Sequence, residues 1–282
     1  MLHQRTVTKP SRLSWTAGVV RMTLSDPADA LDRVLVRARH LAGGDAPVSY
    51  ETEPCWEAWL HRQLGLAWPC PVSAEFEAVW AAAADLVREQ GLELGRGAYG
   101  GWDDADPGLA RAAWCLTAHL QPEKVVETGV ARGLTSRIIL ERLERNGSGH
   151  LWSIDLPAPD AKLHGQIGVA VSQGLRDRWS YLSGSSRQLL PSLLAELGEI
   201  ELFVHDSSHT RRNVSFELEA VWPALGHGVL LADDVHRSDA FGSFISAHSD
   251  ARTAVARADD GKALFGIAIN RPRRLVPYSS HD

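Results

Sequence analysis

Short apolar runs and helix-length segments alternate along the second half of the chain, after Gln121-Pro122. The runs predicted as strands are KVVET, HLWSID, WSYLSG, IELFVHD, GVLLADD and KALFGIAI. The segments predicted as helices are Thr135–Arg145, Ser186–Leu197, Thr210–Leu225 and a stretch from about Asp239, with a looser helical stretch near Ala161–Leu175. Strands that alternate with helices at this pitch are joined by crossovers, which predicts a mostly parallel, doubly wound α/β sheet with helices on both faces.

The first half of the chain has helical periodicity instead. Four helices are predicted, at Ala30–Ala42, Glu53–Leu66, Ser73–Gln90 and Leu109–Leu120. Ser73 is a candidate N-cap and Gly91 a stop signal. Residues 1–25 are polar and irregular, which is typical of a mobile arm. We therefore expect an arm with a helical extension over 1–105 and a Rossmann-like catalytic domain over 106–282.

Composition narrows the classes of partner. The net charge is −6, from 29 basic and 35 acidic residues, and no basic run is long enough to follow a nucleic-acid backbone. The three cysteines, Cys55, Cys70 and Cys115, show no CxxC and no zinc-like Cys/His spacing, which favours reduced thiols and a cytoplasmic location. No segment has the apolar length of a signal peptide or a membrane span. The prediction is a cytoplasmic protein that binds neither nucleic acid nor membrane.

Polar side chains follow the predicted strands of the second half. They are Glu127, Asp155, Ser185, Asp206, Asp233 and Asp234. Ligands of parallel α/β sheets bind beyond the carboxyl ends of the strands, and a strand interior needs no carboxylate. This row of acids therefore predicts a functional site along one edge of the sheet.

The turn ETGVARG, after the first predicted strand, carries the clearest signal. Gly129 and Gly133, with small Ala131 between them, allow positive φ and close approach of a ligand, and the helix behind them offers free N–H groups. The glycine spacing is not the dinucleotide fingerprint G-x-G-x-x-G. Glu127 would repel a pyrophosphate but suits an ammonium group. An amino acid has both an ammonium group for Glu127 and a carboxylate for the helix N–H groups, and the methionine end of S-adenosylmethionine is such a ligand. The alternative is a tight turn that binds no ligand.

Two further strand ends extend this interpretation. Asp155 ends the second strand, where a carboxylate can accept hydrogen bonds from both hydroxyls of a ribose. Ser185 and Ser186 follow the third strand and suit the edge of an adenine, although a helix N-cap at Ser185 explains them equally well.

The motifs VVETGVARG, SIDLP, LSGSSRQLLP, FVHDSSHT and WPALGHGVLLADDV together resemble those of class I methyltransferases, in particular the family 24 type of small-molecule and natural-product enzymes. The resemblance spans about Tyr99–Ile269. It implies a seven-stranded sheet whose last two strands form an antiparallel hairpin. KALFGIAI is the one clear late strand, and Arg274–Pro277 is a short candidate for its partner. It implies S-adenosylmethionine as cofactor, held by Glu127, Thr128, Gly129, Ala131, Gly133, Asp155, Ser185, Ser186, Asp206 and Tyr99.

Three carboxylates, Asp206, Asp233 and Asp234, close two strands that should be neighbours. Clustered carboxylates repel one another unless a cation or a proton neutralises them, and hard oxygen ligands suit Mg²⁺. In the related catechol-type and sugar O-methyltransferases, acids at corresponding strand ends hold Mg²⁺, and the resemblance carries this role to all three. The alternative is that Asp206 only orients the cofactor and Asp234 caps the next helix.

Histidines beside these acids are candidate bases. His236 is the first choice and His209 the second, because imidazole titrates near neutral pH. With Asp206, they form the candidate catalytic group. His205 has an apolar strand context and is expected to be buried, and HDSSH lacks a third soft ligand for zinc. The glycine-rich stretch Gly95–Trp102 reads either as a flap that covers the ligands or as a plain loop.

The leading functional hypothesis is an S-adenosylmethionine-dependent O-methyltransferase of a small hydroxylated acceptor, such as a sugar or a natural-product intermediate. The helical extension would then contribute to the acceptor pocket or to a homo-oligomer interface. A metal-independent enzyme with a histidine base and a non-catalytic S-adenosylmethionine-binding protein remain as alternatives.

Overall fold

The computed structural model describes residues 47–95, 97–104, 106–258, 261 and 263–270, and a few isolated positions before them: Thr16, Val19, Val20, Pro27, Ala30, Leu31, Val34 and Leu35. Most of the predicted arm 1–25, most of the predicted helix Ala30–Ala42 and the candidate strand Arg274–Pro277 lie outside the described residues.

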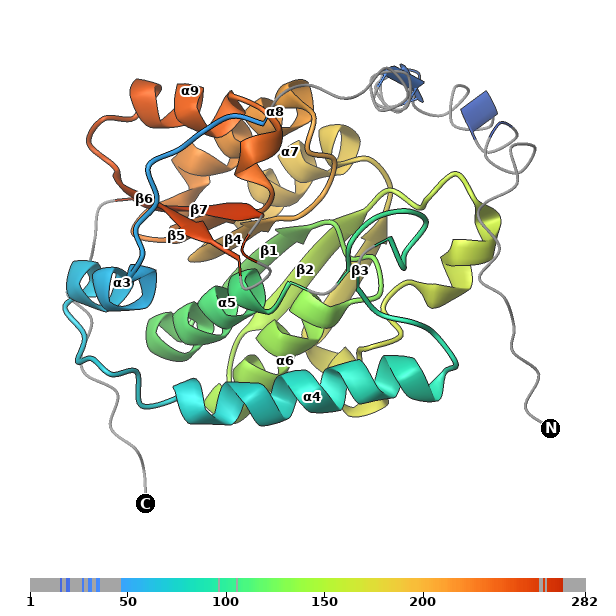
Figure 1. Cartoon of the computed structure of the whole chain (residues 1–282), viewed down its shortest axis with the longest axis horizontal. Helices are drawn as coiled ribbons and strands as arrows, with labels where there is room; N and C mark the ends of the chain where they lie inside the picture. Colours follow the sequence, from blue (N-terminus) through green and yellow to red (C-terminus); the bar gives the residue numbers. More distant parts are fainter. Residues whose placement is uncertain are drawn as a thin grey trace.

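A seven-stranded sheet forms the centre of the molecule (Figure 1). Its strands are β1 Lys124–Thr128, β2 His150–Asp155, β3 Trp179–Ser183, β4 Leu202–His205, β5 Val229–Ala232, β6 Arg252–Arg257 and β7 Leu264–Ile269. They are arranged in the order β3-β2-β1-β4-β5-β7-β6, and the first five are parallel while β7 runs antiparallel to both of its neighbours. The predicted Rossmann-like, mostly parallel sheet is confirmed.

Helices cover both faces of this sheet (Figure 1). One face packs against α5 (Pro107–Leu120) and α6 (Leu134–Asn146), and the other against α7 (Ser186–Leu197), α8 (Arg211–Val221) and α9 (Ala240–Ala247). Successive strand residues divide between these two cores, as their alternating directions require: Val125 lies in the first core and Val126 in the second. The predicted helices of the second half correspond to α6, α7, α8 and α9, and the looser stretch forms two 3₁₀ turns, Ala161–Gln166 and Gln173–Arg178.

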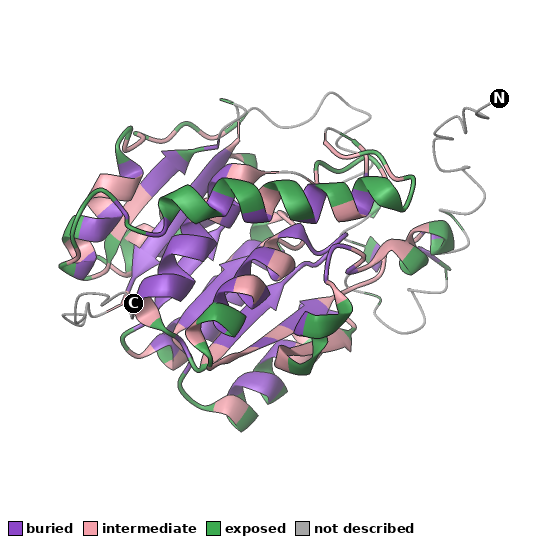
Figure 2. Cartoon of the chain, turned by 90° about the horizontal axis from the view of Figure 1, so that it is seen from below, coloured by how far each residue is buried: buried purple, intermediate pink, exposed green. Residues whose placement is uncertain are grey.

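Two helices from the first half of the chain complete this side of the molecule: α3 (Trp56–Leu64) packs against β6, and α4 (Ser73–Glu89) lies over α5 and α6. The outer face of α4 is exposed and its inner face is buried at Phe76, Val79, Ala83 and Val87, so α5 is enclosed between α4 and the sheet (Figure 2). Leu60 and Phe76 share one core with residues of the strands. None of the described helices is long and apolar enough to cross a membrane.

Two sequence predictions need correction. The partner of β7 is β6, Arg252–Arg257, which precedes it in the chain; the predicted candidate followed it. β6 lies at the edge of the sheet with an exposed arginine at each end, so its pattern lacks the apolar run of a central strand. Ser73 is also not an N-cap: α4 begins at Ser73 itself, whose hydroxyl donates to the Cys70 carbonyl.

The strand order places a topological switch point between β1 and β4, because the chain leaves β1 toward β2 on one side and later returns to β4 on the other. The carboxyl ends of β1, β2, β4 and β5 therefore meet at one edge, which is where the sequence placed its polar residues.

Candidate functional site

The turn after β1 has the backbone that its sequence predicts. Gly129, Ala131 and Gly133 all have positive φ, of 87°, 46° and 80°. A Cβ on Gly129 would overlap the backbone carbonyl of Asp206 and lie 2.8 Å from the amide nitrogen of Ser207. Glycine is thus required here by packing between the β1 and β4 ends as well as by conformation. The loop leads directly into the N-terminus of α6.

Glu127 lies fully buried beneath this loop. Its Oε2 accepts hydrogen bonds from Ser136 Oγ at 2.6 Å and Ser153 Oγ at 2.7 Å, while its Oε1 is buried without a hydrogen-bond partner among the described residues. Burial, reinforced by the charge of Asp155 and opposed by the two serine hydrogen bonds, raises the pKa of Glu127 from 4.5 to about 7. A cationic ligand would supply the partner that this carboxylate lacks.

Replacing Glu127 by glutamine is expected to remove a pH dependence of stability. Because the folded-state pKa is raised, the stabilising contribution is complete below pH 4.5 and is lost as the pH rises through about 7. The ligand-free Glu127→Gln variant should match the wild type near pH 4.5 and exceed its free energy of unfolding at pH 8 by up to roughly 3 kcal/mol. Urea unfolding at both pH values measures this. Equal differences between the two proteins at both pH values would contradict the assignment.

Asp155 ends β2, as predicted, and lies next to the loop Gly129–Gly133. Its Oδ2 accepts a hydrogen bond from the Ala131 amide at 3.2 Å, and its backbone lies opposite Ser183 of β3. The side chain is only partly buried, so it both holds the loop and borders the open edge of the sheet.

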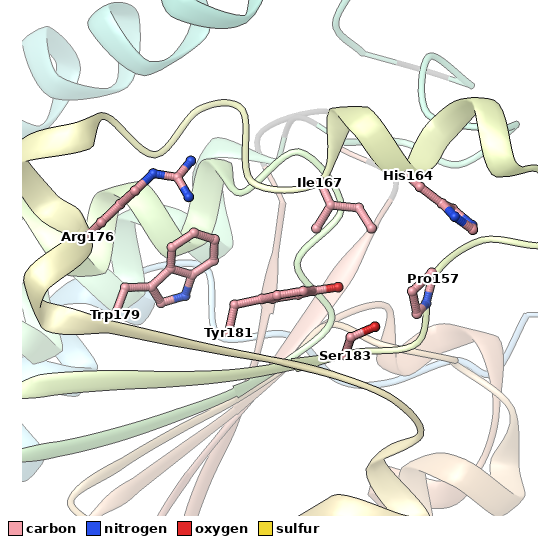
Figure 3. Close-up of a pocket in the computed structure, with 7 residues that line it drawn as sticks. All are labelled: Pro157, His164, Ile167, Arg176, Trp179, Tyr181 and Ser183. Atoms are coloured by element: carbon pink, nitrogen blue, oxygen red, sulfur yellow. The ribbon is translucent and has the colours of Figure 1, made fainter.

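A cavity of about 330 Å³ lies along β3, next to the end of β2. Figure 3 shows Trp179, Tyr181 and Ser183 pointing from the strand toward His164 and Ile167. Pro157 and Arg176 complete its lining. The sequence analysis did not predict this cavity, whose walls come from alternate residues of one strand and from the 3₁₀ segments opposite it.

Some predicted cofactor contacts have other partners. The Thr128 hydroxyl donates to Glu217 at 2.5 Å, and Ser186 Oγ lies 3.5 Å from Asn213 Oδ1. Ser185 is the N-cap residue of α7, yet its side chain makes no capping hydrogen bond, and its Oγ is buried without a hydrogen-bond partner among the described residues. Of these three hydroxyls, only that of Ser185 has no hydrogen-bond partner among the described residues, so it could bind a ligand.

A buried network around Glu217 of α8, which sequence reasoning missed, supports the β4 end. Glu217 contacts His205 Nδ1 at 2.6 Å and accepts hydrogen bonds from Ser207 and Asn213 at 2.8 and 2.9 Å. Burial opposes ionisation, but the charge of His205 and the hydrogen bonds prevail and lower the pKa of Glu217 to about 2. The predicted burial of His205 is confirmed. The network fixes the turn that carries Asp206 and His209.

The acids at the ends of β4 and β5 converge as expected. Asp206, Asp233 and His209 each place a ligand atom within 4.8 Å of the other two. Burial, with the charges of Glu127 and Asp234, raises the pKa of Asp206 well above its usual range, and burial with the charges of Asp206 and Asp234 does the same for Asp233. Asp233 Oδ1 is buried without a hydrogen-bond partner among the described residues. A cation or a shared proton must therefore neutralise this group.

Asp234 occupies a different position from the other two acids. It has positive φ, of 51°, and forms an ion pair with Arg237. Its carboxylate oxygens lie 3.7 Å from His209 Nε2 and 3.7 Å from His236 Nδ1. Asp234 precedes a short 3₁₀ turn without capping it through its side chain, so the capping alternative is not supported.

The two candidate bases differ in what their ring nitrogens can do. The Leu264 amide donates to His236 Nδ1 at 3.3 Å, which places the proton of the neutral ring on Nε2. Burial lowers the pKa of His209 to about 3, so this ring is neutral at physiological pH. Its Nδ1 is buried without a hydrogen-bond partner among the described residues.

The glycine-rich stretch Gly95–Trp102 is anchored to the cofactor loop through Arg132. The Arg132 guanidinium pairs with Asp104 at 2.6 Å, donates to the Ala98 carbonyl at 3.0 Å and lies over the ring of Tyr99. Tyr99 is 6% exposed and Trp102 45% exposed. The described part of this stretch therefore packs on the loop through Tyr99, while Trp102 faces solvent.

A seven-stranded sheet of this order, with its loop at the β1 end and acids after β2, β4 and β5, is the architecture of class I methyltransferases. Residues 126–235 match a family model described as a methyltransferase domain. Residues 126–235 therefore resemble a methyltransferase domain of the family 24 type, and they contain the loop after β1 and the acids after β2, β4 and β5.

Solved structures share this fold. A protein from Klebsiella pneumoniae described as a "putative O-methyltransferase" is 16% identical, with a TM-score of 0.51, over 77% of this chain and 96% of that one. The O-methyltransferase TomG from Streptomyces achromogenes, in complex with S-adenosylmethionine, is 16% identical with a TM-score of 0.50, over 68% and 88%. Cofactor-bound Rv0187 from MTB is 19% identical with a TM-score of 0.50, over 80% and 100%. No curated protein matches the chain.

Proposed function

We propose that this protein transfers a methyl group from S-adenosylmethionine to a hydroxyl oxygen of a small acceptor. The observation that carries the proposal is the loop Gly129–Gly133 between two acids, one buried beneath it and one beside it. Glu127 Oε1 is placed for an ammonium group, and Asp155 for the two hydroxyls of a ribose. One of the related folds was solved with S-adenosylmethionine, which agrees with this assignment.

The cavity along β3 suits the adenine end of the same ligand. Ser183 is the register partner of Asp155, and Pro157 follows Asp155 by two residues, so the cavity continues from the proposed ribose position. The Trp179 and Tyr181 rings offer flat apolar surfaces against which a purine can pack. The sequence suggested Ser185 and Ser186 as contacts of the adenine edge, with a helix N-cap as the alternative. The buried Oγ of Ser185 can still donate to the edge of the base.

We further propose that Asp206, Asp233 and His209 bind a divalent cation such as Mg²⁺. Carboxylate oxygens are the ligands that Mg²⁺ prefers, while the imidazole of His209 suits a transition-metal ion better. An oxygen of Asp233 is buried without a partner among the described residues. Asp234 lies beside this group and adds negative charge. A bound cation would lower the pKa of an acceptor hydroxyl and orient it.

A metal-independent reaction is the second candidate. Neutral His209 could accept the hydroxyl proton directly, whereas His236 carries its proton on Nε2 and is better placed to donate a hydrogen bond to the acceptor. A pKa near 3 makes His209 a weak base, which favours its role as a ligand.

Transfer of labelled methyl from S-adenosylmethionine to a panel of sugars, phenols and polyols tests the proposal. We expect at least one hydroxylated acceptor to be methylated on oxygen, and EDTA to reduce the rate by at least about tenfold, with recovery on addition of Mg²⁺. An unchanged rate in EDTA would assign the reaction to the histidine alone. Methylation confined to nitrogen or sulfur acceptors would overturn the proposed acceptor class.

A further inference from the structure

Four side chains of types that can bind a metal meet between α3, α4 and the second half of α5. They are His61 of α3, Cys70 in the connection to α4, and Cys115 and His119 of α5. Their exposed fractions are 0%, 7%, 7% and 8%. One ligand atom from each lies within 4.8 Å of the other three. Their spacing along the sequence is not zinc-like, and only the fold brings the four side chains together.

The fold brings these residues together from three segments. Cys115 and His119 are four residues apart, so they project from the same face of α5. His61 lies in the last turn of α3, and Cys70 comes nine residues later. The segment from Cys70 to the start of α4 is fixed by hydrogen bonds, from the Trp114 indole to the Val72 carbonyl at 2.9 Å and from the Ser73 hydroxyl to the Cys70 carbonyl at 2.9 Å.

The distances suit a tetrahedral ion. Cys70 Sγ lies 3.8 Å from Cys115 Sγ and 3.4 Å from His119 Nε2, and His61 Nε2 lies 3.2 Å from Cys115 Sγ. Around a tetrahedral Zn²⁺, with bonds of about 2.3 Å to sulfur and about 2.0 Å to nitrogen, ligand atoms are separated by about 3.3 to 3.8 Å. The two sulfurs are too far apart for a disulfide, which has an S–S bond of about 2.05 Å.

The protonation of His61 matches that of a metal ligand. Its Nδ1 lies 2.5 Å from the Ala67 carbonyl, and because a carbonyl only accepts, this nitrogen carries the proton. Nε2 then presents its lone pair to the cluster. A ligating histidine usually donates its second ring N–H to such a carbonyl, which fixes the ring for the metal.

The cysteines provide the matching charge. Metal binding removes the proton from a coordinating thiol, so Cys70 and Cys115 would each contribute one negative charge. Thiolate is the form of cysteine that binds metals. A small cavity of about 10 Å³ is lined by His61, Cys70 and Cys115 of the cluster and by Glu57, Trp68 and Arg111.

We propose that His61, Cys70, Cys115 and His119 bind one Zn²⁺ ion as a structural site. Four protein ligands close the coordination sphere, and two thiolates with two imidazoles select zinc over the hard cations expected at the carboxylate group. His119 lies in the last turn of α5, just before the start of β1, at the opposite end of the sheet from the loop. The ion would fasten α3 and the start of α4 to α5.

Metal analysis of the full-length protein, purified without added metal or chelator, tests this site directly. We expect about one zinc per chain in the wild type and in Cys55→Ser, a matched control because Cys55 is exposed and outside the cluster. Cys115→Ser and Cys70→Ser should each contain less than about one tenth of this zinc. Stripping zinc from the wild type should lower its Tm by at least about 5 °C, and zinc alone should restore it.

Cobalt keeps the test decisive if a cysteine variant fails to fold. Co²⁺ added to zinc-stripped wild-type protein should give the strong visible absorption of a tetrahedral ion and a thiolate-to-cobalt band in the near ultraviolet. The Asp206→Asn variant should give the same thiolate band, because its carboxylate group lies elsewhere. Absence of the band in folded wild-type protein, with no change of Tm on adding zinc, would overturn the proposal. So would a Cys70–Cys115 disulfide found by mass spectrometry in freshly purified protein.

Discussion

Gly129→Ala is expected to abolish measurable binding of S-adenosylmethionine, with a loss of affinity of at least about 100-fold. Gly129 has a φ of 87°, and an added Cβ would overlap the backbone carbonyl of Asp206. Neither backbone can yield alone, because the Gly129 amide donates to the Ile154 carbonyl and the Asp206 amide to the Thr128 carbonyl, both at 2.8 Å. The substitution therefore separates the loop from the carboxyl end of β4.

Gly147→Ala is the matched control for this substitution. Gly147 also has positive φ, of 75°, and lies just after α6, but nothing stands within 4 Å of an added Cβ. It should cost about 1 kcal/mol of stability through its backbone conformation and leave binding unchanged. Calorimetric titration and thermal unfolding of both variants distinguish the cost of positive φ from the steric overlap of the added Cβ with the Asp206 carbonyl. A Gly129→Ala protein with wild-type affinity would show that the loop does not contact the cofactor.

Asp206→Asn is expected to lower turnover by at least about 10²-fold while it stabilises the ligand-free protein. The buried carboxylate lies near those of Glu127, Asp233 and Asp234, and these charges with burial raise its pKa. A neutral amide relieves this repulsion, so the free energy of unfolding at pH 8 should increase by about 1 kcal/mol. The same change removes the charge that would bind a cation, which accounts for the lost turnover.

Asp239→Asn serves as the control for this effect. Asp239 pairs with Arg211 in an ion pair exposed on both sides, so its loss should change stability by less than about 0.5 kcal/mol and leave turnover intact. Steady-state kinetics and urea unfolding at pH 8 test both variants. If Asp206→Asn were destabilised and fully active, Asp206 would be a structural residue.

Local sequence patterns predicted the parts of the fold that depend on neighbouring residues. Apolar runs that end in an acid located β1, β2, β4 and β5, because a central strand buried on both faces must be largely apolar. β6 was not predicted because an edge strand need not be continuously apolar, and Arg252 and Arg257 are exposed at its ends. Positive φ at Gly129 and Gly133 followed from the same local reasoning.

Contacts between distant segments were the parts that the sequence could not supply. Nothing near Glu217 indicates that it accepts a hydrogen bond from Thr128, 89 positions away. The cluster of His61, Cys70, Cys115 and His119 spans three segments. Its one local signal is that Cys115 precedes His119 by four residues on a predicted helix, and two such residues alone do not predict a metal site. His209 was considered as a base, and its position beside Asp206 and Asp233 became visible only in the fold.

Calorimetric titration of S-adenosylmethionine into the wild-type protein, Asp155→Ala and the control Asp177→Ala tests the central claim most directly. Asp177 is an exposed acid of the second 3₁₀ turn. We predict saturable binding at about one site per chain for the wild type and for Asp177→Ala, and at least tenfold weaker binding for Asp155→Ala. An absence of heat and of any thermal shift with the wild type would contradict the assignment of the loop and its two acids to S-adenosylmethionine.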